Sequence, residues 1–176
     1  MVDLVLIHGP PASGKLTLAN QLNTLIGLRV FHNHLTIDVA KALFDFGGDG
    51  FWELVHELRL ASLRSHFEYG SKPAVTTWCY EEPEDLEMFE KIRSIAASSK
   101  GRVLPVFLNC DEKSLESRVG NQQRIQMKKL TDVEQLRAVL ANKNYRSVPD
   151  ELCIELDSSL HTAESNAQKI ITHFNL

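Results

Sequence analysis

Short apolar runs alternate with longer stretches of helical periodicity along most of this chain. Five of the runs are dense in Val, Ile, Leu and Phe, which is typical of strands covered on both faces. The predicted strands are Val2–His8, Leu28–His32, Pro73–Cys79, Val103–Asn109 and Leu152–Asp157. Strands that alternate with helices favour a parallel sheet, because each crossover returns the chain to the same edge. The pattern therefore predicts an α/β fold built on a five-stranded parallel sheet.

The stretches between these strands have apolar residues three or four positions apart, as in helices that cover a sheet. The predicted helices are Lys15–Ile26, Thr36–Phe44, Phe51–Tyr69, Glu84–Ser98, Glu112–Val119, Thr131–Asn144 and Thr162–Phe174. No repeat, low-complexity tract or linker divides them, and 176 residues is an ordinary length for one domain. We therefore expect one domain over residues 1–176, with helices on both faces of the sheet in three layers.

A glycine-framed loop lies between the first predicted strand and the first predicted helix. Gly9 and Gly14 allow the backbone to curl so that successive N–H groups face an anionic phosphate, and the helix N-terminus adds its positive dipole end. The Lys15 ammonium would reach the β- and γ-phosphates of a nucleotide. Strand, loop and helix in this order form a P-loop, or Walker A, site, which predicts ATP binding. The nucleotide-binding residues are Gly9, Pro10, Pro11, Ala12, Ser13, Gly14, Lys15, Leu16 and Thr17.

The residue after the loop lysine departs from the strict P-loop pattern. A Ser or Thr at this place would offer its hydroxyl to Mg²⁺, whereas this chain has Leu16. Thr17 follows, and its hydroxyl is within reach of an α-phosphate. Because a leucine side chain cannot ligate a metal, Mg²⁺ would have to be held by water and by other residues.

Two further segments have the features of moving parts. At about 36–70, two predicted helices flank the cluster Gly47-Gly48-Asp49-Gly50, which is a flexible joint. At about 120–130, a polar and basic segment follows a predicted helix. We expect the first segment to be a flap over an acceptor molecule and the second to be a lid, with a plain solvated loop as the alternative for 120–130.

These features resemble a small P-loop kinase of the nucleoside-monophosphate-kinase type, most closely the shikimate kinase, gluconate kinase and chloramphenicol phosphotransferase group. The phosphate loop also resembles that of adenylate kinases, in which the residue after the lysine likewise has no hydroxyl and Thr follows. The segment Leu115-Glu-Ser-Arg118 and the later Arg124 resemble the Leu-x-x-Arg motif and the lid arginine of the group. The resemblance implies that Arg118 stacks on adenine and that Arg124 closes over the phosphates; the alternative is two solvated helix-end arginines.

The acidic pair that the group carries after its second strand is missing here. This chain has His32, Asn33 and His34 at that place, with Asp38 one helical turn later. A carboxylate beside an imidazole would raise its basicity, so His34 with Asp38 is a candidate general base for an acceptor hydroxyl. Alternatively, Asp38 only favours the helix N-terminus while the histidines bond to the backbone.

Other candidate contacts come from the third strand and the predicted flap. The end of the third strand has Cys79-Tyr80-Glu81-Glu82 instead of a Walker B aspartate, so Glu81 or Glu82 is a candidate for holding Mg²⁺ through water. Asn33, His34 and Arg59 are candidates for binding the acceptor. An arginine can fork onto a carboxylate or phosphate, although a solvent-facing charge is the alternative for Arg59.

Composition narrows the range of partners. The formal net charge of −4 gives no general attraction to nucleic acid or to an anionic membrane. No apolar run approaches the roughly 20 residues of a membrane span. The start Met-Val-Asp lacks the basic residues of a signal peptide. The three cysteines, Cys79, Cys110 and Cys153, are widely spaced and odd in number, which predicts free thiols in a cytoplasmic protein.

The sequence thus predicts a kinase that uses ATP and Mg²⁺ to phosphorylate a hydroxyl of a small-molecule metabolite. Lys15, Arg124, and His34 or Asp38 are its predicted catalytic residues. Two alternatives stay open. A nucleoside or nucleotide kinase is favoured by the adenylate-kinase-like loop, and a non-catalytic ATP- or ADP-binding module is favoured by the missing acidic residues. No motif identifies the acceptor or the oligomeric state.

Overall fold

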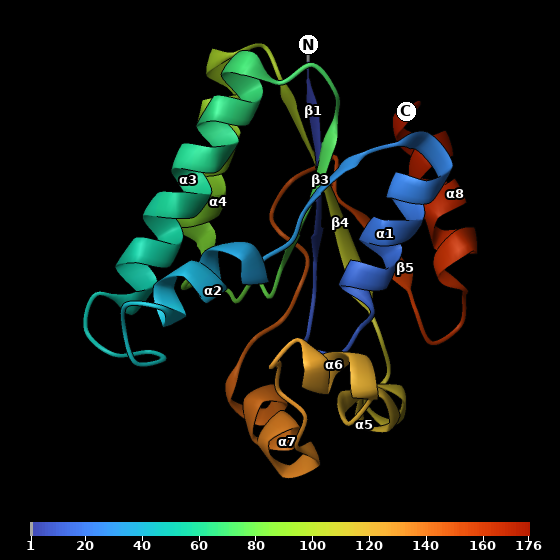
Figure 1. The fold of residues 1–176 in the computed structure, drawn as a ribbon. Coiled ribbons are helices and arrows are strands. Elements are labelled where there is room, and N and C mark those ends of the chain that lie inside the picture. The colour runs from blue at the N-terminus through green and yellow to red at the C-terminus, as the bar shows by residue number, and fades with distance from the viewer. Residues whose placement is uncertain (1) are drawn as a thin grey trace.

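All five predicted strands form one parallel sheet (Figure 1). The computed structural model describes residues 2–176. The sheet has the order β2-β3-β1-β4-β5, with β1 at the centre. Each neighbouring pair is parallel, so the carboxyl ends of the strands meet at one edge. The bounds are β1 Asp3–His8, β2 Arg29–Phe31, β3 Ala74–Trp78, β4 Arg102–Asn109 and β5 Ile154–Asp157.

Eight helices accompany the sheet in the described part of the chain. Seven match predicted helices with small shifts at their ends, the largest in α2, which begins at His34 and ends at Lys41 instead of spanning 36–44. The eighth, α6, lies in the segment 120–130 and was missed because a single polar turn has no apolar stripe. The bounds are α1 Lys15–Ile26, α2 His34–Lys41, α3 Phe51–Tyr69, α4 Leu86–Ser98, α5 Glu112–Val119, α6 Gln122–Gln126, α7 Val133–Asn142 and α8 Ala163–Phe174.

Helices cover both faces of the sheet, as Figure 1 shows. Leu4 and Leu6 of β1 pack with side chains of α3 and α4 on one face. Val5 and Ile7 pack with side chains of α1 and α8 on the other. All four side chains are fully buried, because successive residues of a strand point to opposite faces and here both faces are covered. This is the physical reason why β1 reads as an unbroken apolar run.

Three helices, α5, α6 and α7, lie beyond the carboxyl ends of the strands instead of on a face of the sheet (Figure 1). A small apolar cluster joins α5 and α7 to the loop after β1, with Ala12 packed against Leu115, Val119 and Leu136. Ligands of parallel α/β sheets bind outside the carboxyl ends of the strands. The three helices therefore surround the place where a site is expected.

Two further predictions concern membrane-spanning helices and the state of the cysteines. None of the helices in residues 2–176 combines the length and the apolar character that a membrane span requires. Cys79, Cys110 and Cys153 are free thiols, as their number and spacing predicted.

Candidate active site

The phosphate loop connects β1 to α1 at the carboxyl edge of the sheet. Gly9 and Gly14 have positive φ angles of 144° and 91°, and Gly14 is the N-cap of α1. A Cβ on Gly9 would lie 2.5 Å from the carbonyl oxygen of Leu108 in β4, so only glycine fits at this position. Ala12 also has a positive φ, of 65°. Such turns form the concave backbone that binds anions.

The donors of this loop are free to meet a ligand. Within residues 2–176, the backbone N–H groups of Gly14, Lys15 and Leu16 donate to no protein acceptor. The Lys15 ammonium donates to the carbonyl oxygens of Gly9 (2.8 Å) and Pro10 (2.7 Å), which holds it over the loop. Burial lowers the pKa of Lys15. Free N–H groups at a helix N-terminus, next to a cation, form a binding site for phosphate.

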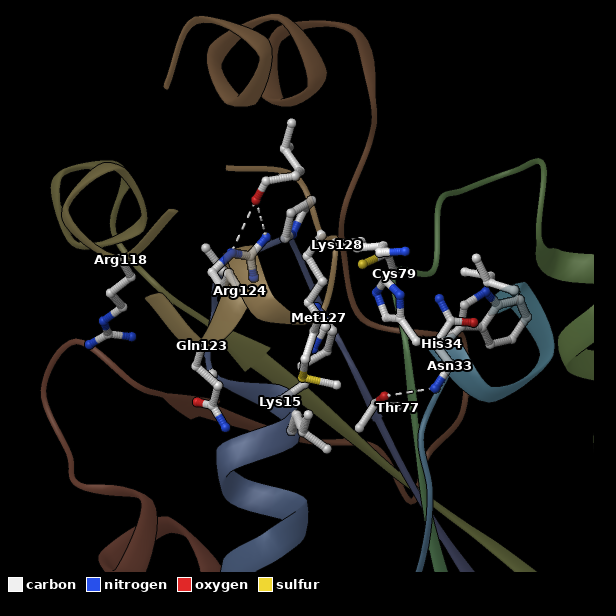
Figure 2. Close-up of a pocket in the computed structure, with 18 of the residues that line it drawn as sticks. Lys15, Asn33, His34, Thr77, Cys79, Arg118, Gln123, Arg124, Met127 and Lys128 are labelled. Carbon is white, nitrogen blue, oxygen red and sulfur yellow. Dashed lines mark hydrogen bonds between the residues drawn. The ribbon is translucent and has the colours of Figure 1, made fainter. Parts of the chain in front are cut away.

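The loop borders a cavity of about 570 Å³ that is lined by cations (Figure 2). No Asp or Glu is among its lining residues in the described chain. The lining is thus positively charged, although the chain as a whole has a formal net charge of −4. Such a lining attracts a polyanionic ligand. The cationic lining residues are Lys15, Lys41, Arg118, Arg124, Lys128 and Lys129.

Different elements build the two sides of the cavity, as Figure 2 shows. Arg118 of α5 and Gln123 of α6 lie on one side of Lys15. Asn33, the N-cap of α2, and His34, its first residue, lie on the other side. The cavity therefore offers one region toward α5 and α6 and a second region toward α2, with the phosphate loop between them.

Both arginines that the resemblance implied line the cavity and are held by protein acceptors. Arg118 donates to the Sγ of Cys110 (3.3 Å), and to the Oγ (3.1 Å) and carbonyl oxygen (2.8 Å) of Ser158. Arg124 donates from Nε (3.1 Å) and Nη2 (2.8 Å) to the carbonyl oxygen of Leu130. Both side chains are half-buried. These contacts disagree with the alternative of two solvated helix-end arginines.

His34 lines the cavity, whereas Asp38 does not. Asp38 is exposed, and it forms no hydrogen bond with His34 in the described chain. Burial lowers the pKa of His34 to about 4; Lys129 adds to this effect, and Asp38 opposes it. Asp38 therefore raises the pKa of His34 as predicted, but the pKa still ends below its usual value, because the imidazole loses more hydration on burial than the exposed carboxylate compensates.

Arg59 lies one layer behind the cavity wall. Its side chain is only 5% exposed, and it is not among the lining residues. Its Nη2 donates to the Oδ1 of Asn33, and its guanidinium lies over the ring of Trp78 at 5.3 Å. Asn33 does line the cavity. Arg59 is thus not a solvent-facing charge. From this position it does not contact an acceptor directly, and it supports Asn33 instead.

Glu81 and Glu82 follow β3 as predicted, but they lie outside the cavity. The carboxylate of Glu81 pairs with Lys143, and that of Glu82 lies 3.7 Å from Arg146. Both basic residues belong to the connection between α7 and β5. The predicted magnesium candidates are therefore engaged in ion pairs away from the phosphate loop.

The residues around the loop do not form a protein site for Mg²⁺. In residues 2–176, no three His, Cys, Asp or Glu side chains are grouped to hold a metal ion. The cavity has no carboxylate, Leu16 has no ligand atom, and Thr17 contributes one exposed hydroxyl. Mg²⁺ requires six oxygen ligands and gives up its water reluctantly. This donor set does not fit Mg²⁺ as a resident ion.

We expect the protein without nucleotide to bind no Mg²⁺ at about 1 mM, a concentration at which even weak protein sites for calcium are half filled by their ion. Isothermal titration of MgCl₂ into the protein measures this directly. The same titration with ADP present is the control, because the diphosphate then supplies oxygen ligands. A stoichiometric Mg²⁺ site in the protein alone would contradict this conclusion.

Among the cavity residues that the sequence did not single out are Lys41, Cys79, Phe46 and Trp52. Lys41 lies two turns after His34 on the same face of α2, so helical spacing could have found it. Cys79 lines the cavity at the place of the missing aspartate, and its proximity raises the pKa of Lys15 against the larger effect of burial. No spacing rule points to Cys79, since its position depends on the end of β3.

His8, the last residue of β1, is a buried histidine that the sequence did not single out. Its side chain is fully buried, and its Nδ1 has no partner in the described chain. Burial lowers the pKa of His8 to about 3, and the charge of Lys15 adds to the effect. An imidazole in the unfolded chain titrates near 6.5. Below that pH the unfolded chain therefore binds more protons than the folded protein at this residue.

This difference predicts acid destabilisation. The contribution of His8 to the free energy of unfolding is fully present above about pH 6.5 and is lost as the pH falls toward 3. His34 contributes in the same direction, down to about pH 4. We expect the free energy of unfolding to decrease over this range, and His8→Gln to make the decrease smaller. Urea unfolding at about pH 7, 5.5 and 4.5 measures the slope. Equal slopes for the variant and the wild type would exclude His8 as a source of the acid destabilisation.

The fold is that of solved P-loop kinases. A gluconokinase from Sinorhizobium meliloti is 12% identical with a TM-score of 0.66, over 99% of this chain and 91% of its own. The APS kinase of Mycobacterium tuberculosis, solved with AMPPNP and APS, is 15% identical with a TM-score of 0.64, over 99% and 98%. The shikimate kinase of Acinetobacter baumannii, solved with shikimate, is 16% identical with a TM-score of 0.58, over 99% and 94%.

No protein-family model and no curated protein sequence matches the chain. At identities of 12–16%, the likeness to solved structures establishes the fold. The chain thus has the three-layer fold of small-molecule P-loop kinases, as the order of its elements and its phosphate loop predicted.

Proposed function

We propose that this protein is a kinase that transfers the γ-phosphate of ATP to a hydroxyl group of a small-molecule metabolite. One observation carries the proposal: a phosphate loop with free N–H groups opens into a cavity lined by six cations and no carboxylate. The structural likeness to gluconokinase, APS kinase and shikimate kinase supports it.

The nucleotide would occupy the loop and the side of the cavity toward α5 and α6. Its phosphates would meet the free N–H groups and Lys15, and its base would lie toward Arg118. Arg118 is held by hydrogen bonds to Ser158, and its planar guanidinium is a group on which a base can stack. The APS kinase neighbour was solved with the ATP analogue AMPPNP, which supports a nucleoside triphosphate at this place.

Transfer would depend on positioning and charge. The acceptor oxygen bonds to the γ-phosphorus as the bond to the ADP oxygen breaks, and the acceptor proton passes to His34. Lys15 and Arg124 stabilise the negative charge on the transferring group. Mg²⁺ would arrive with the nucleotide and neutralise part of its phosphate charge. The segments 36–70 and 120–130 would close as flap and lid to exclude water, and Gly47 and Gly50, both with positive φ, mark the turn before α3.

The test is incubation with ATP, Mg²⁺ and a metabolite extract, followed by mass spectrometry for a species that gains one phosphate. We expect one such product and its absence with the Lys15→Met variant. ATP binding without a phosphorylated product from any fraction would instead support the nucleotide-binding module, which the cavity without carboxylates favours. Nucleosides and nucleoside monophosphates belong in the acceptor panel, because the adenylate-kinase-like loop keeps the nucleotide-kinase alternative open.

We expect His34→Gln to lower the transfer rate by about 10²-fold, the lower range for a general base. Glutamine keeps a polar group at the cavity wall but cannot take a proton. Because the pKa of His34 is about 4, the wild-type imidazole is unprotonated throughout the neutral range but is a weaker base than an ordinary histidine, which is why the effect is placed at the lower end. Steady-state kinetics with nucleotide titration measures the effect. A variant with the wild-type rate would remove His34 from the mechanism.

A further inference from the structure

Asn33 is held from three directions at the α2 side of the cavity. Its backbone N–H donates to the Oγ1 of Thr77 (3.2 Å), and its carbonyl oxygen accepts from the Oγ1 of Thr36 (3.2 Å). Its side-chain Oδ1 accepts from Arg59, which is itself buried against Trp78. The position of the Asn33 side chain is therefore set by the protein before any ligand binds.

The contact with Arg59 also decides which way the Asn33 amide faces. A guanidinium has only donors, so the amide atom that meets it must be the oxygen. The Nδ2 group then faces away from Arg59, and it makes no hydrogen bond to the protein in residues 2–176. Asn33 lines the cavity beside His34, as Figure 2 shows. It therefore offers N–H donors to a ligand, and the ligand atom that meets them must be an acceptor.

The rest of this side of the cavity combines one cation with aromatic faces. The ammonium of Lys41 lies 5.2 Å from the ring centroid of Phe46 and has no ion-pair partner in the described chain. Phe46 and Trp52 also line the cavity, with their rings in edge-to-face contact at 5.6 Å. They are 65% and 41% exposed, so apolar surface is left open to a ligand here. Donors, a cation and apolar rings together suit an anion that has an apolar face.

We infer that the acceptor carries an anionic oxygen group, a carboxylate or a phosphate, which Asn33 and Lys41 receive, and that its carbon skeleton lies against Phe46 and Trp52. Arg59 is the positioning residue that keeps the Asn33 donors turned toward the acceptor. The inference rests on the proposed function and adds the chemical class of the acceptor. Arg59 was expected to bind the acceptor directly. In this inference it acts through Asn33 instead.

The test uses the full chain saturated with AMPPNP, so that the phosphate loop is filled before a probe is added. Three probes share one ring: benzoate, phenyl phosphate and the neutral benzamide. Quenching of tryptophan fluorescence reports binding, because the chain has two tryptophans, Trp52 and Trp78, and both line the cavity. We expect one or both anions to bind about tenfold more tightly than benzamide, as a charge-assisted contact implies. Comparison of the two anions shows which group the subsite takes.

Variants assign the effect to residues. Lys41→Met should remove most of the preference for anions without changing benzamide binding, and Lys72→Met, at an exposed lysine outside the cavity, is the matched control. Asn33→Asp keeps the partner of Arg59 but replaces the donor by a negative oxygen, so both anionic probes should lose affinity. Arg59→Lys keeps a donor toward Asn33 and should preserve the preference, whereas Arg59→Met should reduce it. Thermal unfolding of each variant separates this readout from loss of fold.

The outcomes are distinguishable. Failure of AMPPNP to bind the wild-type protein would contradict the proposed function. With AMPPNP bound, equal responses to the three probes, including no response to any, would overturn only the inference about the acceptor. A preference for anions that survives both Lys41→Met and Asn33→Asp would show that other residues receive the anion and would overturn the assignment.

Discussion

Replacing Lys15 with Met is expected to lower the rate of phosphoryl transfer by about 10³-fold and to weaken ATP binding by about tenfold. The Lys15 ammonium is held over the phosphate loop by the carbonyl oxygens of Gly9 and Pro10, beside N–H groups without protein acceptors. Methionine has a similar length and no charge, so it removes the cation while filling most of its space. The loss should be larger in transfer than in binding, because negative charge shifts within the phosphates as the reaction proceeds.

The same substitution should not destabilise the fold. Burial lowers the pKa of Lys15, which shows that the folded protein disfavours the charge at this position. We therefore expect the thermal midpoint of Lys15→Met to equal or exceed that of the wild type. Lys113→Met, at an exposed lysine of α5, is the control and should change neither property. Calorimetry with ATP, transfer kinetics and thermal unfolding test the three expectations. Full ATP affinity and activity in Lys15→Met would refute both the kinase and the nucleotide-binding proposals.

Gly9→Ala is expected to destabilise the protein by about 3 kcal/mol and to abolish measurable ATP binding. The added Cβ would lie 2.5 Å from the carbonyl oxygen of Leu108, which belongs to the neighbouring strand and cannot rotate away. The φ of 144° adds backbone strain for any residue with a side chain. Relief of the clash would require β1 and β4 to separate at the point where the loop begins, so loop geometry and sheet pairing should fail together.

Gly27→Ala provides the matched comparison for Gly9→Ala. Gly27 ends α1 with a φ of 72°, but a Cβ there has nothing within 4 Å. Its substitution should cost about 1 kcal/mol from backbone conformation alone and should leave ATP binding intact. Urea unfolding and calorimetry distinguish the two sites. Similar losses of stability in both variants would mean that positive φ, and not the contact with Leu108, sets the requirement for glycine.

The parts of the fold that were predictable are those encoded in contiguous residues. The apolar run at Val2–His8 identifies a buried strand, because both faces of β1 are covered. The glycines and the lysine of the phosphate loop identify an anion site, because backbone conformation and charge within one short segment are enough to build it. The order of the strands across the sheet does not follow from such local patterns, since it depends on packing between distant segments.

The candidate site was predictable in part. The resemblance pointed to Arg118 and Arg124, and both line the cavity, yet it carried no information on the residues that replace the acidic groups. Glu81 had the expected place after β3, but Lys143, distant in sequence, competes for its carboxylate. His34 had the expected place at the start of α2, but its burial outweighs the effect of Asp38 on its pKa. In both cases the outcome depends on how much hydration the side chain loses and on which charged partner folding brings near it.

The sequence by itself determined that this chain has a parallel α/β sheet and a phosphate-binding loop at the end of its first strand. Apolar periodicity, glycine conformation and local charge act over a few neighbouring residues. The structure that they predict therefore depends little on how distant segments pack. Only the tertiary structure decided that Arg59 supports Asn33 from behind, that Lys41 joins the cavity, and that Glu81 and Glu82 are drawn into ion pairs away from it. The roles of these side chains depend on short distances and on loss of water, and both arise when segments far apart in the chain pack together.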